Sequence, residues 1–125
     1  MATAYGRAGA SQDDVNVAEV HDCFTVMGAI GAEVIGKAAP GEGAAYWRDG
    51  RARPDGECGI NTSGGLIAKG HPVGATGVAM IGWAALQLLG KAPEGVQVPN
   101  PKLAATFNIG GPICASVCTV LRPVG

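Results

Sequence analysis

The chain has 125 residues, 47% of them apolar, and a formal net charge of −1, which fits one globular domain with a buried core. Nine basic residues against ten acidic ones leave no basic surface for nucleic acid. The first residues, MATAYGRAGASQDD, lack the basic and apolar regions of a signal peptide. We therefore expect an intracellular, cytoplasmic protein, or a peroxisomal one if the source is eukaryotic.

The first predicted elements are a helix, a strand and a second helix. Residues 2–10 resemble the end of a helix that Gly9 stops, and the valine-rich VNVAEV (15–20) predicts a short buried strand. From Phe24 the apolar residues follow helical spacing. The intervening His21-Asp22-Cys23 is thus expected at the carboxyl end of a strand, where open α/β sheets place their ligands.

The rest of the chain predicts a layered α/β fold. Residues 36–59 hold eight charged residues and two prolines and are expected to be largely surface loop. GINTSGGLIA then predicts a short strand running into turns, and residues 74–90 a helix that is apolar nearly all round and so covered on all sides. Its apolar run is too short for a membrane span, which needs about 20 residues. Two strands joined at residues 110–112 should form an antiparallel hairpin.

Four cysteines, at positions 23, 58, 114 and 118, do not follow the spacing of a zinc ribbon. An intracellular setting argues against disulfides, so we expect at least some of them to be free thiols. Cys114 and Cys118 lie four apart in the last predicted strand, so they should share one face and pack in the core.

The glycine-rich segment GHPVGATG (70–77) permits several interpretations. It precedes a helix, as a phosphate-binding loop would, but it contains neither GK[ST] nor GxGxxG. His71 could be a polar turn residue, or it could act with His21 and Cys23, because a cysteine near an imidazole can serve as acid, base or nucleophile. A zinc site from these residues and Cys58 fits no known ligand spacing, so we predict no metal.

The motifs VAEVHDCF, INTSGGLIAKGHPVGATG and FNIGGP, in this order and spacing, resemble the C-terminal half of thiolases, in particular the sterol-carrier-protein type and its bacterial lipid-transfer-like relatives. The resemblance covers nearly the whole chain. It implies the C-terminal half of a thiolase-like fold: a mixed sheet with helices on both faces, within an αβαβα layered architecture. It also implies an acyltransferase that cleaves or condenses acyl-coenzyme A thioesters, with coenzyme A thioesters as substrates and no bound cofactor.

The resemblance assigns a role to four residues. His71 matches the histidine that activates the nucleophile and lines an oxyanion hole, and Cys23 matches the acid/base cysteine. His21 takes the place of an asparagine that positions a water in other thiolases, and Gly110 falls where a backbone amide lies near the acyl oxygen. Asn108 stands where many thiolases carry the acid/base cysteine, which agrees with its relocation to Cys23.

Related steroid side-chain aldolases lack the cysteine of HDCF and the glycine of GHP. This chain retains both, so the resemblance favours thiolysis or condensation over retro-aldol cleavage.

The resemblance also implies that the nucleophilic cysteine and the first strand of this half lie outside residues 1–125. We therefore expect one thiolase C-terminal domain without a second domain, inactive alone, that forms a homo- or hetero-oligomer with an N-terminal thiolase half or a second subunit. The alternative is a non-catalytic thiolase remnant that binds a partner or a lipid or acyl-CoA ligand. The sequence does not identify the acyl group, the substrate-binding residues or the direction of the reaction.

Overall fold

The structure is a computed structural model that describes residues 1–111 and 114–124. It is built on a four-stranded sheet with the strand order β2-β1-β3-β4. The strands are β1 (Val17–Val20), β2 (Gly59–Ile60), β3 (Ala104–Gly110) and β4 (Ala115–Leu121). Strand β1 is parallel to β2 and β3, and β4 is antiparallel to β3. The mixed α/β fold predicted from the sequence is confirmed.

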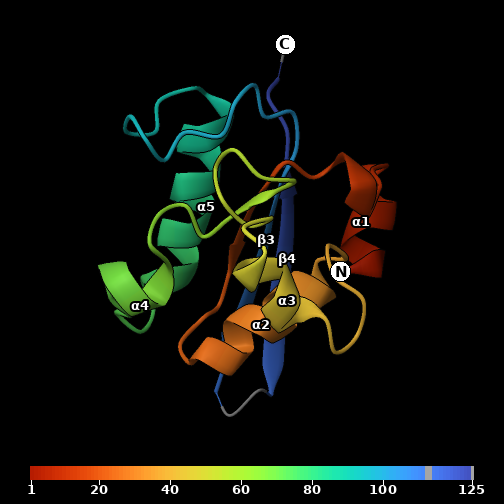
Figure 1. Cartoon of the computed structure of the whole chain (residues 1–125), viewed down its shortest axis with the longest axis vertical. Helices are drawn as coiled ribbons and strands as arrows, with labels where there is room; N and C mark the ends of the chain where they lie inside the picture. The colour runs from red at the N-terminus through yellow and green to blue at the C-terminus, as the bar shows by residue number, and fades with distance from the viewer. Residues whose placement is uncertain (112–113, 125) are drawn as a thin grey trace.

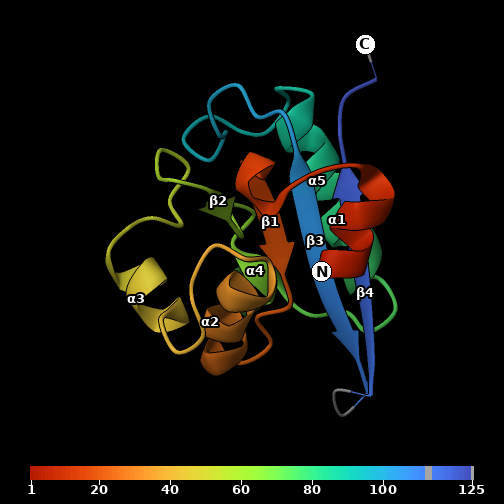
Figure 2. The same ribbon diagram turned by 90° about the vertical axis from the view of Figure 1, so that its right-hand side faces the viewer.

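Helices cover both faces of this sheet (Figures 1 and 2). On one face lie α1 (Ala2–Ala8) and α2 (Thr25–Val34), and on the other lies α5 (Thr76–Leu88). Alternation along the strands divides the core accordingly, because side chains of successive strand residues point to opposite faces. Ala18 and Val20 pack in the larger cluster with α2, whereas Val17 packs against Ala84 of α5.

Most of the elements expected from the sequence are present near their predicted bounds. Helix α1 ends at Gly9, which adopts the left-handed conformation (φ 59°) that glycine permits at a helix C-terminus. The two final strands form the predicted antiparallel pair. Their connection was predicted at residues 110–112, and position 112 lies outside the described residues.

The segment 36–59 is more ordered than the predicted surface loop. It contains the short helix α3 (Gly43–Arg48), which packs against α2. Tyr46 is fully buried there, and Arg51 lies over its ring at 4.4 Å from the centroid. Further short helical elements are η1 (Gln12–Asp14) and α4 (Gly65–Lys69).

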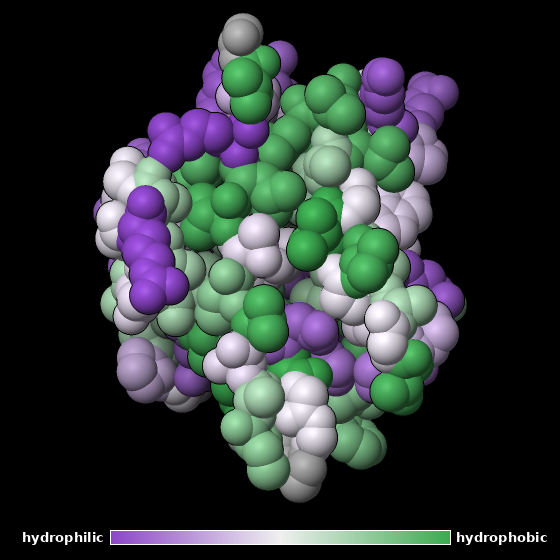
Figure 3. Space-filling model, turned by 180° about the vertical axis from the view of Figure 1, so that it is seen from behind, coloured by the Kyte–Doolittle hydropathy of each residue, from purple (hydrophilic) through white to green (hydrophobic). Residues whose placement is uncertain are grey.

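Helix α5 is not covered on all sides, which contradicts the prediction. Met80, Ala84 and Gln87 are buried against the sheet and its loops, but Val78 is 73% exposed and Ile81 39% exposed. Viewed from behind, hydrophobic residues predominate across the middle of the molecule (Figure 3). This chain therefore leaves an apolar face open beside the sheet.

The two cysteines near the end of the chain differ from the prediction in part. Cys114 precedes β4 and is exposed, so it is not a core residue. Cys118 lies within β4 and packs, partly buried, against the larger core cluster. The prediction that both cysteines share one core-facing side of a strand was wrong, because β4 begins only at Ala115.

Candidate active site

The site forms where β1 ends, and Asn61 fixes that end. The side chain of Asn61 accepts a hydrogen bond from Val20 N at 2.7 Å and donates one to Val20 O at 3.0 Å. Asn61 itself has a positive φ of 50°, which asparagine tolerates better than most residues. Because β1 stops here, the chain leaves the sheet at His21, as predicted.

Asp22 anchors the glycine-rich segment against the end of β1. Its Oδ1 accepts a hydrogen bond from Leu66 N at 2.7 Å. A Cβ atom at Gly65 would lie 2.0 Å from Asp22 Oδ2, and Gly65 also has a positive φ of 62°. Only glycine allows this approach of backbone to carboxylate, so α4 and the His71 loop are held beside the HDCF motif.

A buried ion pair supports the same loop. Glu19 of β1 is 1% exposed; its Oε2 accepts a hydrogen bond from Ser63 Oγ at 2.7 Å and lies 3.3 Å from Lys69 Nζ. Burial raises the pKa of the Glu19 carboxyl, and the partners Ser63 and Lys69 oppose that shift. Lys69 lies two residues before His71, so the contacts among Glu19, Ser63 and Lys69 hold the start of the His71 loop in place.

His71 is held by the first turn of α5. Its Nδ1 lies 2.8 Å from Thr76 Oγ1, and that hydroxyl donates its hydrogen to Pro72 O at 3.2 Å. A threonine hydroxyl carries one hydrogen, so here it accepts from the protonated Nδ1 of His71. A neutral ring in this tautomer carries its lone pair on Nε2.

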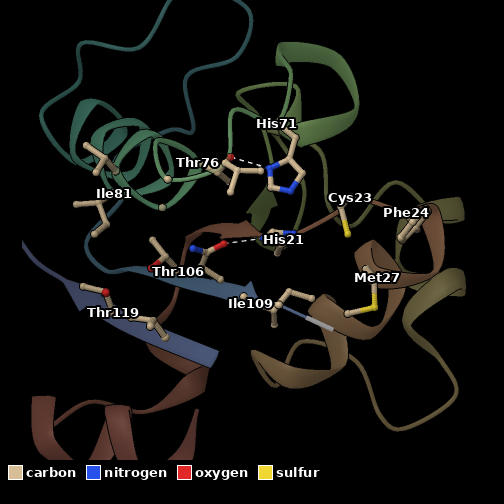
Figure 4. A pocket seen from close by; sticks show the side chains of 18 residues that line it. His21, Cys23, Phe24, Met27, His71, Thr76, Ile81, Thr106, Ile109 and Thr119 are labelled. Carbon is tan, nitrogen blue, oxygen red and sulfur yellow. Dashed lines mark hydrogen bonds between the residues drawn. The ribbon is translucent and has the colours of Figure 1, made fainter. Parts of the chain in front are cut away.

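The two histidines of the chain meet at this point. Their ring centroids are 4.9 Å apart and the rings are nearly perpendicular, at 89°. On the side of the sheet, His21 Nδ1 lies 2.6 Å from Asn108 Oδ1 of β3. Figure 4 shows His71 above His21, with the hydrogen bonds of both rings as dashed lines.

All four residues predicted for the site line one cavity, whose volume is about 860 Å³. Cys23 lies between His21 and α2 in the sequence, and Gly110 is the last residue of β3. Apolar side chains form much of the remaining wall, namely Phe24, Met27, Val73, Val78, Ile81, Ile109 and Val117. The cavity thus offers two imidazoles and a thiol beside an apolar surface.

Among the described residues no group of His, Cys, Asp and Glu could hold a metal ion. Cys23, Cys58 and Cys118 are free thiols. Cys58, considered with the zinc alternative, is 1% exposed and outside the cavity wall, and burial raises the pKa of its thiol to about 12. It is a core residue.

Sequence reasoning did not identify Thr76 as a partner of His71 or Asp22 as the anchor of the glycine-rich segment. A hydroxyl in the first helical turn after a loop histidine was the available signal for Thr76. Asn108 was singled out only as a departure from the thiolase pattern, and its contact with His21 depends on the pairing of β1 with β3.

No helix within residues 1–111 and 114–124 is long and apolar enough to cross a membrane.

The chain matches the family model described as "Thiolase C-terminal domain-like" over residues 1–123. It is 42% identical over 108 residues to an acetyl-CoA acetyltransferase of Methanothermobacter thermautotrophicus, covering 86% of this chain and 28% of that protein. It is 41% identical over 121 residues to human sterol carrier protein 2, covering 97% of this chain and 22% of the relative.

A solved structure with a similar fold is the "Ltp2-ChsH2(DUF35) aldolase". The TM-score is 0.81 at 23% identity, over 95% of this chain and 29% of that one. At this identity the likeness concerns the fold alone. The chain spans less than a third of each of these proteins. The family model, which matches residues 1–123, shows that the chain belongs to the thiolase C-terminal domain-like family.

Proposed function

We propose that this chain forms part of a thiolase-type acyltransferase that cleaves or condenses 3-oxoacyl-CoA and acetyl-CoA thioesters. In this proposal Cys23 is the acid/base, His71 activates the nucleophile, and His21 orients a water or substrate group. The observation that carries it is the convergence of Cys23, His21 and His71 on one cavity, with the two imidazoles 4.9 Å apart.

The tautomer of His71 suits a base that later acts as a donor. With Nδ1–H donated to Thr76 Oγ1, the Nε2 lone pair can take the proton of an attacking thiol. Nε2–H then becomes a donor for the negative charge that develops on the thioester oxygen. A preorganised donor of this kind contributes about 2.7–4 kcal/mol in known oxyanion holes.

Cys23 supplies the second proton transfer. Cleavage of a 3-oxoacyl thioester by thiol leaves an acetyl-CoA enolate, and that carbanion must receive a proton at its α-carbon. Cys23 S–H gives this proton in cleavage and its thiolate removes it in condensation, so the same group serves both directions. The backbone amide of Gly110, at the end of β3, is proposed as a further donor to the acyl oxygen.

The nucleophilic cysteine is proposed to come from a segment outside these 125 residues. Among the described residues that line the cavity, the one cysteine is Cys23, and this proposal already uses it as acid/base. Because the chain covers 28% of the archaeal relative, the remaining part of such an enzyme, or a second subunit, would close the open apolar side of the cavity.

The test is a chimera in which this chain replaces the matching segment of the archaeal acetyl-CoA acetyltransferase. We expect thiolysis of acetoacetyl-CoA, with a kcat lowered roughly 100-fold or more by Cys23→Ala and by His71→Ala. Cys118→Ala is the matched control, because Cys118 lies on the opposite face of β4 from the cavity residues Val117 and Thr119. A folded chimera that is inactive, or whose activity survives both substitutions, would contradict the proposal.

The apolar wall and the likeness to sterol carrier protein 2 favour a second candidate, a non-catalytic module that binds a lipid or acyl-CoA ligand. The same chimera distinguishes the two. A chimera that binds acyl-CoA but gives no turnover would favour the binding module.

A further inference from the structure

We propose that Asn108 is a positioning residue that fixes His21 in the tautomer protonated on Nδ1. The Nε2 lone pair of His21 then faces the cavity as a permanent hydrogen-bond acceptor. The catalytic consequence of this inference rests on the proposed function, but the tautomer itself does not.

The backbone holds the two residues opposite each other. Val20 pairs with Phe107 in the parallel β1–β3 ladder, and His21 N donates to Phe107 O at 2.9 Å. His21 directly follows Val20, and Asn108 directly follows Phe107. His21 Nδ1 lies 2.6 Å from Asn108 Oδ1. His21 is 4% exposed, so water does not compete freely for this nitrogen.

The far side of the Asn108 amide is also confined. A Cβ atom at Gly77, in the first turn of α5, would lie 2.8 Å from Asn108 Nδ2. The amide is therefore wedged between α5 and the His21 ring. Gly82 of the same helix has no atom within 4 Å of its Cβ position, so close approach is specific to Gly77.

The chemistry of the amide explains why asparagine suits this place. A carbonyl oxygen can only accept, so it selects the Nδ1–H tautomer of a neutral imidazole. It carries no charge, so it does not favour a second proton on the ring as a carboxylate would. A neutral ring keeps Nε2 free to accept a hydrogen bond from a water or from a thiol.

His21 and His71 would then present the same nitrogen to the cavity. Thr76 holds Nδ1–H of His71, and Asn108 holds Nδ1–H of His21. Two acceptors 4.9 Å apart between ring centroids can share one bound water or one reacting proton.

The test is the ¹⁵N spectrum of the imidazole rings of this chain, recorded at about pH 8, where unperturbed imidazoles are neutral. The chain has two histidines, so His21→Gln assigns both sets of signals. We expect His21 with a protonated Nδ1 and an unprotonated Nε2. Wild-type His21 protonated on Nε2 would overturn the proposal.

Two substitutions at Asn108 test whether this residue causes the Nδ1–H tautomer of His21. Asn108→Leu, similar in volume but without an acceptor, should release His21 into a mixture of tautomers. Asn108→Asp should instead keep Nδ1–H and raise the doubly protonated fraction at about pH 7. A His21 tautomer unchanged by Asn108→Leu would overturn the proposal.

Gly77→Ala provides an indirect variant that leaves Asn108 in place, with Gly82→Ala as its matched control on α5. Gly77→Ala should shift the His21 signals and Gly82→Ala should not. In all four variants the Nδ1–H tautomer of His71 should persist, which shows that the fold around Thr76 is intact. If His71 lost its Nδ1–H tautomer in all four variants, Gly82→Ala included, a specific role for Asn108 would be contradicted.

In the active chimera, Asn108→Leu should lower kcat roughly 10- to 100-fold with little change in KM. If Asn108→Leu instead lowered kcat/KM by the same factor through a higher KM, with kcat unchanged, the positioning role would be overturned. The spectra separate this result from the proposed function, because an inactive chimera with His21 in the Nδ1–H tautomer would contradict the thiolase chemistry while supporting the role of Asn108.

Discussion

The glycines of the segment 59–77 are needed for two different physical reasons. At Gly65 a side chain would collide with Asp22, whereas Gly70 and Gly74 have open space around them. The latter two have φ values of 96° and 87°, which favour glycine on conformational grounds alone. They form the turns on either side of His71, which is the role that the sequence suggested in preference to a phosphate-binding loop.

At the residue scale, Cys58 makes stability depend on alkaline pH. Burial raises its thiol pKa from 9.0 to about 12 in the folded chain. Its stabilising contribution is therefore complete below pH 9.0 and is lost as the pH rises through about 12. Wild type should lose roughly 1 kcal/mol per pH unit above pH 9 relative to Cys58→Ala.

The measurement is urea unfolding of both proteins between about pH 8 and pH 11. Burial and the nearby Cys58 thiolate raise the pKa values of Tyr5 and Tyr46 too. Both proteins contain these tyrosines, so the difference reports the thiol together with its charge effect on the two phenols. Parallel stability curves would contradict the assignment of Cys58 to the core.

At the scale of elements, glycines let α2 approach the sheet. A Cβ atom at Gly31 would lie 2.7 Å from Val20 Cβ and Cγ2, whereas one at Gly28 would make ordinary contact at 3.5 Å with Asp22 Cβ. Helix α2 follows directly from the HDCF motif, so this approach also determines where Cys23 leaves β1.

Gly31→Ala should destabilise the fold by about 1–3 kcal/mol, the usual cost of overpacking. Gly28→Ala in the same helix is the matched control and should be neutral or stabilising by up to about 1 kcal/mol. Thermal unfolding followed by circular dichroism compares them. Equal effects of the two substitutions would show that α2 does not pack on β1 as described.

The long elements and the valine-rich strand were predictable from sequence, whereas the short helices α3 and α4 were not. Helix α5, with its extended apolar run, and the β3–β4 pair were expected near their observed bounds. Helix α3 has six residues and α4 has five, too few for a helical period to emerge. Both are stabilised by contacts distant in sequence, such as the bond from Leu66 N to Asp22.

The site shows the same division. The resemblance to thiolases suggested Cys23, His21, His71 and Gly110 as site residues, and the fold places all four on the wall of one cavity. The partners of the two histidines could not be deduced, because the contact of His21 with Asn108 spans 87 residues and depends on the β1–β3 register.

At the scale of the whole molecule, the apolar face should make this chain associate. Val78, Ile81 and Val117 are 73%, 39% and 62% exposed beside the cavity, and contiguous apolar surface usually marks an interface. Sedimentation velocity should show concentration-dependent association that Val78→Lys weakens.

Val124→Lys is the matched control for association, because Val124 is 98% exposed but lies outside the cavity wall. It should leave association unchanged. A monodisperse monomer across the whole concentration range would contradict an interface at this face.

The central claim is that Cys23 moves the α-proton of the acyl thioester, and proton exchange tests it most directly. The chimera is incubated with acetyl-CoA in D₂O, and deuterium in the acetyl methyl group is followed by mass spectrometry. The account predicts exchange in the chimera, its loss in Cys23→Ala, and its persistence in Cys118→Ala. Exchange at the same rate in Cys23→Ala would contradict the account.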